Sequence, residues 1–318
     1  MMLLYRSIAL LVLSTTVLWA QKPAEMGAIL DNDLYVSPVS DQYYTNGIAL
    51  FYRYLGNAKN KKVAKKITEF RLGQQIYNPQ SVRAEDINVN DRPFAGYLFA
   101  QAGINTYYIS ESVLKLNLQM GVVGPESGAE HLQEGLHSIL GYPTVKGWQH
   151  QIKTLLAVQL NAFYSKKLFP NRNNNQTDFH LQANADVGTV FTGITAGGMM
   201  RINLNKYKGL VPVYNSGLHD ATLSKDKTTY NGRRELFLFV NPNANYQFYD
   251  ATIEGSLFND DSPVTFPLIP LRFVGEVGVT YNYNNWNLSY SFNYFSKKLS
   301  NIVITGHYYG TITVGYLL

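Results

Sequence analysis

An alternation of apolar and polar residues with a period of two constrains the fold of this chain more than any other feature. From Leu114 to Val122 every second residue is Leu, Met or Val, and the residues between them are Lys, Asn, Gln and Gly. Trp286–Tyr294 and Leu271–Tyr283 repeat the pattern with aromatic and aliphatic residues. Such segments are β-strands with one apolar and one polar face. The sequence therefore predicts an all-β protein.

Two all-β architectures produce this alternation, a β-sandwich and a transmembrane β-barrel. Strands of roughly 10–15 residues match a tilted membrane span. The polar face is rich in Gly, Asn, Gln and Ser, as in a barrel lumen, and Tyr and Trp gather near the strand ends. Only 15% of the residues are charged, against about a quarter in soluble domains. These features favour the barrel, and the sandwich remains the alternative.

The number of strands follows from counting the alternating segments. They are 25–33, 45–55, 67–77, 95–108, 112–122, 150–165, 177–190, 194–204, 234–253, 270–283, 285–298 and 306–318. A turn at Asn241-Pro242-Asn243 would raise the count to thirteen, but bacterial barrels have even numbers of strands. We therefore interpret 241–245 as a kink and predict a twelve-stranded antiparallel transmembrane β-barrel. Asn284-Asn285 becomes a tight periplasmic turn, and 205–233 becomes an unusually long periplasmic loop.

The N-terminus has the pattern of an export signal. Arg6 precedes a short apolar stretch from Ser7 to Trp19, which ends at Ala20-Gln21. The stretch is too short to span a bilayer, and a strand or anchor is the alternative. We expect 1–20 to be removed as a signal peptide, leaving 21–318 as a single outer-membrane barrel domain.

Charge and cysteine content exclude several classes of function. Loss of Arg6 leaves 26 basic and 22 acidic residues, a net charge of +4. With no nucleic-acid motif, this charge gives no reason to expect nucleic-acid binding. The chain has no Cys, which excludes disulfides, a thiolate zinc site and a cysteine nucleophile.

One helix is predicted, over residues 125–141. Pro125 would open it and Gly141 would close it. An apolar stripe at helical spacing is expected to pack against the protein, formed by Ala129, Leu132, Leu136, Ile139 and Leu140. Gln133 and His137 are one turn apart on a neighbouring polar stripe. A periplasmic N-terminus places this helix outside the cell, with the loops 34–44, 78–94 and 123–149.

The first of these extracellular loops follows a group of hard oxygen ligands. Asp31-Asn32-Asp33 lies at the outer end of the first strand and suits Ca²⁺, although the spacing is not that of an EF-hand. Neither a G-x-S-x-G nor an H-E-x-x-H motif occurs in the chain.

Several motifs in order resemble the outer-membrane lipid A 3′-O-deacylase family. They are Asn32-Asp33, Asp41–Gly47, Asp91–Gly96, Gly121–Pro125, Gln133–Gly141 and Trp148–Gln151. The resemblance covers 25–151 by motif and the remainder by barrel pattern. It implies a twelve-stranded barrel with one short extracellular loop helix, in the bacterial outer membrane. Such enzymes remove the 3′-linked acyloxyacyl chain of lipid A and depend on Ca²⁺.

The resemblance assigns roles to individual residues. It implies Asn32 and Asp33 as metal ligands, and Thr45 as an active-site residue. It implies His137 as the helical histidine, with Gln133 one turn before it. The active site would lie at the outer rim, facing the cell exterior, between the wall and the loop helix.

Two arginines are further candidates for contact with lipid A. A basic substrate-binding residue would fall near Arg83, and Arg92 lies in the better-matching stretch, where a structural role is equally open. The expected partner is lipopolysaccharide of the outer leaflet, and the protein is expected to be a monomer.

These residue types are consistent with ester hydrolysis. A neutral imidazole at His137 can take a proton from water, and Gln133 or a carbonyl can orient its other ring nitrogen. Ca²⁺ held by Asn32 and Asp33 can polarise the ester carbonyl, while Thr45 can position the water or complete the site through its hydroxyl.

Two other functions remain open. A non-catalytic barrel, such as a porin, receptor or structural protein, would not depend on His137. A phospholipase would need a Ser beside a His on neighbouring outward-facing strands.

Overall fold

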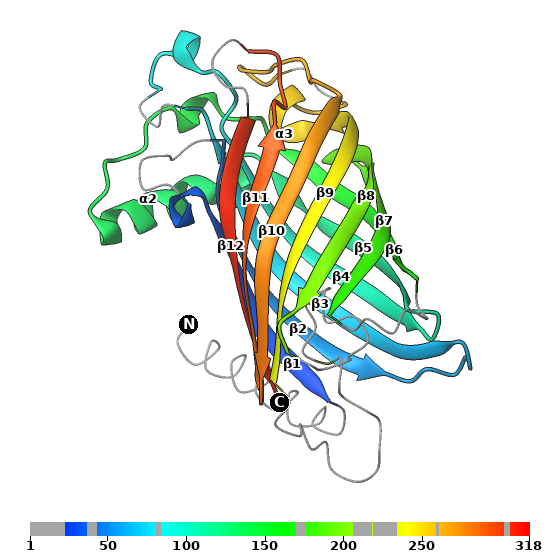
Figure 1. Cartoon of the computed structure of the whole chain (residues 1–318). Coiled ribbons are helices and arrows are strands. Elements are labelled where there is room, and N and C mark those ends of the chain that lie inside the picture. The colour runs from blue at the N-terminus through cyan, green and yellow to red at the C-terminus, as the bar shows by residue number, and fades with distance from the viewer. Residues whose placement is uncertain are drawn as a thin grey trace, which may run out of the picture.

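A closed barrel of twelve antiparallel strands forms the body of the molecule (Figure 1). The computed structural model describes residues 23–36, 43–80, 84–169, 176–205, 218, 234–258, 261–301 and 306–318. The predicted barrel and strand number are confirmed, and the sandwich alternative is wrong. The expected signal peptide lies outside the described residues and stays a prediction.

Each strand pairs with its neighbours in the chain, and β1 pairs with β12 to close the barrel. The strands are β1 Ala24–Asn32, β2 Tyr43–Gly56, β3 Val63–Asn78, β4 Ala95–Tyr108, β5 Ser112–Val123, β6 Leu155–Leu168, β7 Thr177–Gly188, β8 Phe191–Asn203, β9 Arg234–Asp250, β10 Leu271–Tyr283, β11 Trp286–Ser296 and β12 Gly306–Leu317. The amide of Leu318 donates to the carbonyl of Ala24 over 2.9 Å. The start of β1 and the end of β12 therefore lie at the same end of the barrel, which we take as periplasmic.

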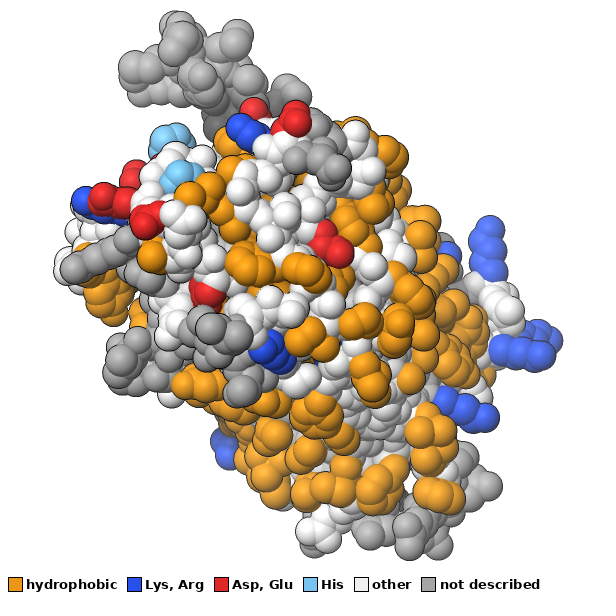
Figure 2. Space-filling view, turned by 90° about the horizontal axis from the view of Figure 1, so that it is seen from above, with side chains coloured by type: hydrophobic (Ala, Val, Ile, Leu, Met, Phe, Trp, Pro, Cys, Tyr) orange, Lys and Arg blue, Asp and Glu red, His pale blue; other side chains and the backbone are white. Residues whose placement is uncertain are grey.

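The alternation separates a lipid-facing wall from a polar lumen. On β5, Leu116 and Leu118 are exposed on the outer surface, whereas Asn117 and Gln119 hydrogen-bond inside the barrel. Figure 2 shows hydrophobic side chains spread over the flank of the molecule. None of the helices in the described part of the chain is long and apolar enough to cross a membrane.

The ninth strand is continuous through Asn241-Pro242-Asn243, as predicted. Pro242 lies opposite Gly275 of β10, and the pairing with β8 breaks between Gly197–Asn243 and Met200–Val240. Proline has no amide proton, so it cannot donate to the neighbouring strand. The predicted turn at Asn284-Asn285 is also confirmed. It is a two-residue connection from Tyr283 to Trp286.

Ion pairs fill the lumen. Glu25 and Glu69 both pair with Arg53, at 3.3 Å and 3.7 Å, and Arg71 contacts Glu69 at 2.8 Å. Buried charges persist only when such partners neutralise them. These groups pack the part of the described lumen that lies beside β1, β2 and β3.

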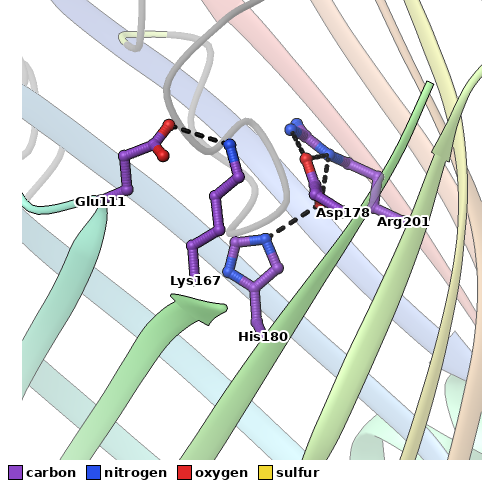
Figure 3. A network of polar contacts seen from close by, with 5 residues as sticks. All are labelled: Glu111, Lys167, Asp178, His180 and Arg201. Carbon is purple, nitrogen blue, oxygen red and sulfur yellow. Dashed lines mark hydrogen bonds and ion pairs between the residues drawn. The ribbon is translucent and has the colours of Figure 1, made fainter. Parts of the chain in front are cut away.

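A second lumen network lies on β7 and β8, also toward the periplasmic end (Figure 3). His180 on β7 contacts Asp178 at 3.0 Å, and Arg201 on β8 holds the same carboxylate. Beside them Lys167 pairs with Glu111 at 3.0 Å. The first group links β7 to β8, and the second links β6 to the turn between β4 and β5.

The long connection between β8 and β9 contributes one described residue, Leu218. Its side chain is buried in an apolar cluster with Leu55, Ile67 and Phe237, and its carbonyl accepts a 2.6 Å bond from Lys65. Leu218 therefore sits in the periplasmic part of the barrel.

The predicted helix 125–141 is shorter than expected. Pro125–Ser127 forms a separate 3-10 turn, η3, and helix α2 runs over Ala129–Leu140. Gly128 between them has φ of 68°, a left-handed conformation that interrupts the helical path. Gly141 closes the helix at φ of 73°, as predicted.

Two further short elements shorten predicted strands at the extracellular end. Trp148–His150 forms a 3-10 turn, η4, so β6 begins at Leu155 rather than at residue 150. The single turn α3, Ala251–Glu254, follows β9, whose predicted end was residue 253. Asp250 caps α3 by accepting a bond from Thr252 N. Two more 3-10 turns lie at this end, η1 over Asp33–Tyr35 and η2 over Ile87–Val89.

Candidate active site at the extracellular rim

The outer face of the wall carries Asn32, Asn46 and Ile76 side by side at the extracellular rim. Asn32 of β1 lies opposite Asn46 of β2, which lies opposite Ile76 of β3. Leu50 lies four residues from Asn46 along β2, and Leu72 lies four residues from Ile76 along β3. Both leucines are exposed on the outer surface. Because side chains alternate between the faces of a strand, all three rim residues point outward.

Thr45 occupies a β-bulge next to this row. Tyr44 pairs with Tyr77 and Asn46 with Ile76, so Thr45 has no opposing residue in β3. Its side chain is fully buried, and its hydroxyl oxygen lies 3.5 Å from the side-chain amide nitrogen, Nδ2, of Asn46. Bulges often re-aim a side chain beside an active site. The register thus brings Thr45 together with Asn32.

Asn32 and Asp33 offer oxygen atoms where β1 ends. The side-chain oxygen of Asn32 accepts a 2.6 Å bond from the amide of Leu34, and its amide group donates to Asn46. Asp33 is the first residue of η1 and is buried. In the described ranges no three His, Asp or Glu side chains group as metal ligands. A carboxylate and an amide oxygen fit Ca²⁺, whose remaining ligands would be carbonyls and waters.

Helix α2 is anchored against the outer face of the same wall. A Cβ on Gly96 of β4 would meet Ala129 at 2.3 Å, so only glycine allows the first turn of α2 this close. Gln74 of β3 donates a 2.7 Å bond to the carbonyl of Ser127, just before the helix. Gln74 is two residues from Leu72 and therefore also points outward.

The face that α2 turns to the protein is not the one expected from sequence. Its buried residues are Ala129, Gln133 and His137, whereas Ile139 and Leu140 are exposed. The expectation that the apolar stripe does the packing is wrong for the C-terminal half of the helix. Figure 1 shows α2 outside the barrel, to the side of the upper parts of the strands rather than over the lumen.

The imidazole of His137 is oriented by the segment that follows the helix. Its Nδ1 lies 2.8 Å from the carbonyl oxygen of Pro143. A carbonyl only accepts, so Nδ1 carries the proton and the lone pair of the ring is on Nε2. Tyr142 packs edge-on against the ring, with 5.6 Å between centroids.

Gln133 is fixed by Trp148 rather than by His137. The indole Nε1–H of Trp148 donates to Oε1 of Gln133 over 3.0 Å, and both side chains are fully buried. Phe94 packs on the indole at 5.0 Å. Because Oε1 accepts from the indole, the remaining amide atom, Nε2, is a hydrogen-bond donor. Gln133 Nε2 is buried without a partner among the described residues.

The wall residues and the helix residues meet in one buried layer. Ile76, Ala129 and Trp148 belong to the same apolar cluster, and Leu132 packs against it. Ile76 is also the neighbour of Asn46 in the rim row. The two groups that the sequence singled out, 88 to 105 residues apart, therefore lie on the same part of the rim.

Sequence reasoning assigned no role to Pro143 or Trp148. Trp148 opens one of the motifs that carried the resemblance, but nothing in the motif indicates that its N–H contacts Gln133. Every residue has a backbone carbonyl, so the sequence cannot indicate that the carbonyl of Pro143 contacts His137.

Arg92 is built into the protein, which argues against the substrate-binding role predicted for it. Its guanidinium donates to the carbonyls of Pro93, Tyr43 and Thr252, at 3.0–3.4 Å, and lies 4.8 Å over the ring of Tyr77. The side chain is buried. Arg92 thus ties the 84–94 segment to β2 and α3 across the extracellular mouth. Arg83 lies outside the described residues, so its role stays a prediction.

A polar cavity inside the barrel is a less suitable place for lipid chemistry. Its volume is about 300 Å³, and Asp31, Asp186, Tyr77 and Lys298 are among its lining residues. Burial, and then the charge of Arg272, lower the pKa of Lys298 to about 7. Phe191, Val274 and Phe295 also line the cavity, but these buried charged groups lie inside the barrel, away from the lipid-facing side.

The two described strand histidines do not match a phospholipase site. His180 points into the lumen beside Asp178 (Figure 3), and His307 is buried against Phe295 inside the barrel. Neither faces the outer surface, where that alternative requires its Ser and His.

Comparisons with known proteins agree with this architecture. A family model described as "Outer membrane protein LpxR" matches residues 5–318. No curated protein matches the chain. The structure of LpxR from Salmonella typhimurium aligns with a TM-score of 0.73 and 20% identity, covering 92% of this chain and 99% of that one.

Other outer-membrane barrels are more distant. The β domain of the Bordetella autotransporter BrkA aligns with a TM-score of 0.44 and 9% identity, covering 93% of this chain and 98% of that one. An outer membrane channel from Pseudomonas putida F1 aligns with a TM-score of 0.43 and 9% identity, over 93% and 95%.

Proposed function

Because the chain belongs to the LpxR family of outer membrane proteins, we propose that it is a Ca²⁺-dependent esterase that removes the 3′-linked acyloxyacyl chain of lipid A. The observation that carries this proposal is the position of His137. Its ring is held with the lone pair on Nε2, on a helix packed against the lipid-facing side of the rim. Lipid A lies in the outer leaflet beside that wall.

The chemistry begins with proton transfer to His137. Nε2 takes a proton from a water molecule, and the hydroxide oxygen attacks the carbonyl carbon of the ester. The Pro143 carbonyl, which accepts from Nδ1–H, stabilises the imidazolium that forms. The tetrahedral intermediate then collapses, the bond to the sugar oxygen breaks, and that oxygen takes the proton back from His137. The products are a carboxylic acid and an alcohol.

Gln133 would stabilise the negative charge of the intermediate. Its Nε2–H is a buried donor one turn from His137, and the indole of Trp148 fixes its orientation. Donors held in place before reaction stabilise an oxyanion without reorganising. Thr45, in its bulge, would position the attacking water.

Asn32 and Asp33 would hold the metal ion. When bound there, Ca²⁺ would polarise the ester carbonyl and take part of the developing negative charge. The donor set supports this assignment, since both residues provide hard oxygens and Asp33 is buried.

The barrel interior argues against the porin alternative. Ion pairs occupy part of the described lumen, and Arg92 joins segments across its outer mouth. A non-catalytic receptor or structural barrel has no use for the oriented imidazole.

Mass spectrometry of cellular lipid A tests the proposal directly. Cells that express the protein should contain lipid A lighter by one acyloxyacyl chain at the 3′ position. Cells without it, or with His137→Ala, should retain the chain. Unchanged lipid A in expressing cells, with the barrel present in the outer membrane, would refute the proposed activity.

Trp148→Phe should lower kcat about tenfold while leaving KM nearly unchanged. The substitution keeps the ring against Phe94 but removes the N–H that holds Gln133, an interaction of about 1.4 kcal/mol, which corresponds to about tenfold in rate. Steady-state hydrolysis of purified lipid A measures this. Trp286→Phe, at the far end of the barrel, is the matched control and should be silent. Wild-type kcat for Trp148→Phe would show that the indole only packs.

A further inference from the structure

The C-terminal end of α2 exposes large apolar side chains. Ile139 is 83% exposed, Leu140 61% and Tyr142 46%, and we call these three residues the α2 tip. Burying such a side chain away from water is favourable. A tip that met only water would forgo this stabilisation, so its surroundings need an explanation.

The tip lies on the lipid side of the barrel. The first turn of α2 rests on the outward faces of Gln74 and Gly96. On the same wall Leu50 and Leu72 are more than half exposed, as expected for side chains in contact with lipid. In Figure 1 α2 runs beside the upper parts of the strands rather than above them. The apolar surface of the wall and that of the tip therefore face the same medium.

The composition of the tip fits lipid rather than water. From Ser138 to Thr144 no residue is charged. Tyr142 combines an apolar ring with a polar hydroxyl, the property that enriches Tyr at membrane interfaces. Aliphatic residues that enter the acyl layer beside such a ring are typical of interfacial helices.

We infer that the α2 tip is a membrane-contact surface, and that Ile139 and Leu140 enter the acyl-chain layer of the outer leaflet. The inference deepens the proposed function, because Tyr142 packs against His137 at 5.6 Å. An acyl chain that lies along the tip therefore reaches the imidazole of His137. The tip then recruits the substrate chain from the bilayer while the buried face of α2 holds the catalytic groups.

Site-directed spin labelling tests the membrane contact without reference to catalysis. The chain has no Cys, so Ile139→Cys and His131→Cys each provide a single labelling site. His131 is exposed on the same helix and serves as the matched control. In bilayers of phosphatidylcholine, the label at 139 should collide mainly with oxygen, which partitions into lipid, and the label at 131 with a nickel chelate in water.

Two results would overturn the inference. One is equal access of the nickel chelate to both labels. The other is dipolar broadening between labels at 139, because it would show that a second copy of the chain covers the tip.

A kinetic experiment tests the consequence for the substrate. Ile139→Asp should raise KM for lipid A in vesicles about fivefold, since a carboxylate at the membrane interface costs about 1 kcal/mol. For lipid A dispersed in detergent, KM should stay near the wild-type value. An equal rise in both media would assign Ile139 to the fold or to direct substrate binding. A wild-type protein without any deacylase activity would refute the proposed function but leave the labelling result standing.

Discussion

Replacing His137 with Ala or Gln should lower kcat/KM for lipid A hydrolysis by about 10²- to 10⁴-fold, the usual contribution of a general base. Neither residue can take a proton from water at neutral pH. The release of fatty acid from purified lipid A measures the loss.

His131 is the control on the same helix. Its side chain is exposed, whereas that of His137 is buried against the protein. His131→Ala should therefore retain nearly full activity. Loss of activity in His131→Ala with activity preserved in His137→Ala would overturn the assignment of the base. Equal, small losses in both would indicate that α2 merely covers the rim.

The barrel should tolerate the His137 substitutions. Twelve closed strands and a lipid-facing wall stabilise the fold, and α2 is anchored at its other end by Ala129 and Ser127. Heat-dependent migration on gels should match that of the wild type. An inactive variant that also fails this test would say nothing about catalysis.

Removal of Ca²⁺ should abolish activity, and addition of Ca²⁺ in excess of the chelator should restore it. Asp33 supplies the carboxylate of the proposed site, so Asp33→Asn should raise the Ca²⁺ concentration for half-maximal activity by at least about tenfold, or 1.4 kcal/mol. Titration of hydrolysis with Ca²⁺ after chelation measures both effects. Full activity in excess chelator would remove the metal role.

Asp31→Asn is the matched control for this experiment. Asp31 is two residues from Asp33, but its oxygens accept bonds from Tyr44 and Thr311 inside the lumen, at 2.6 Å and 2.7 Å. Its substitution should leave the Ca²⁺ requirement unchanged. If both substitutions shift that requirement equally, the ion is bound on the lumen side of β1.

The strands were predictable because each of them separates two media. Lipid outside and polar groups inside impose the same period of two along every strand. Each strand can therefore be recognised in the sequence without knowing which strands it pairs with. Leu271–Tyr283 and Trp286–Tyr294 were located almost to the residue. Even Pro242, a turn signal by itself, was placed correctly, because bacterial outer-membrane barrels have even numbers of strands.

The meeting of the site residues was not predictable from the pattern alone. Asn32 reaches Asn46 through the register of β1 on β2, and Thr45 is buried through a one-residue bulge. Register depends on contacts along the whole strand pair. The resemblance identified Asn32 and Thr45 as site residues. Only the tertiary structure shows that they lie together at the rim.

The sequence by itself determined that α2 has an apolar stripe beside a polar one, with Gln133 and His137 on the polar stripe. It could not determine which stripe faces the protein. In water an amphipathic helix buries its apolar side, and that rule led to the wrong orientation for Ile139 and Leu140. In the tertiary structure the polar stripe faces the protein at this end of the helix, because Trp148 and Pro143 hydrogen-bond to Gln133 and His137. Ile139 and Leu140 are therefore exposed. An amphipathic pattern indicates that a helix lies between a polar and an apolar environment. Only the tertiary structure determines which environment the protein itself provides.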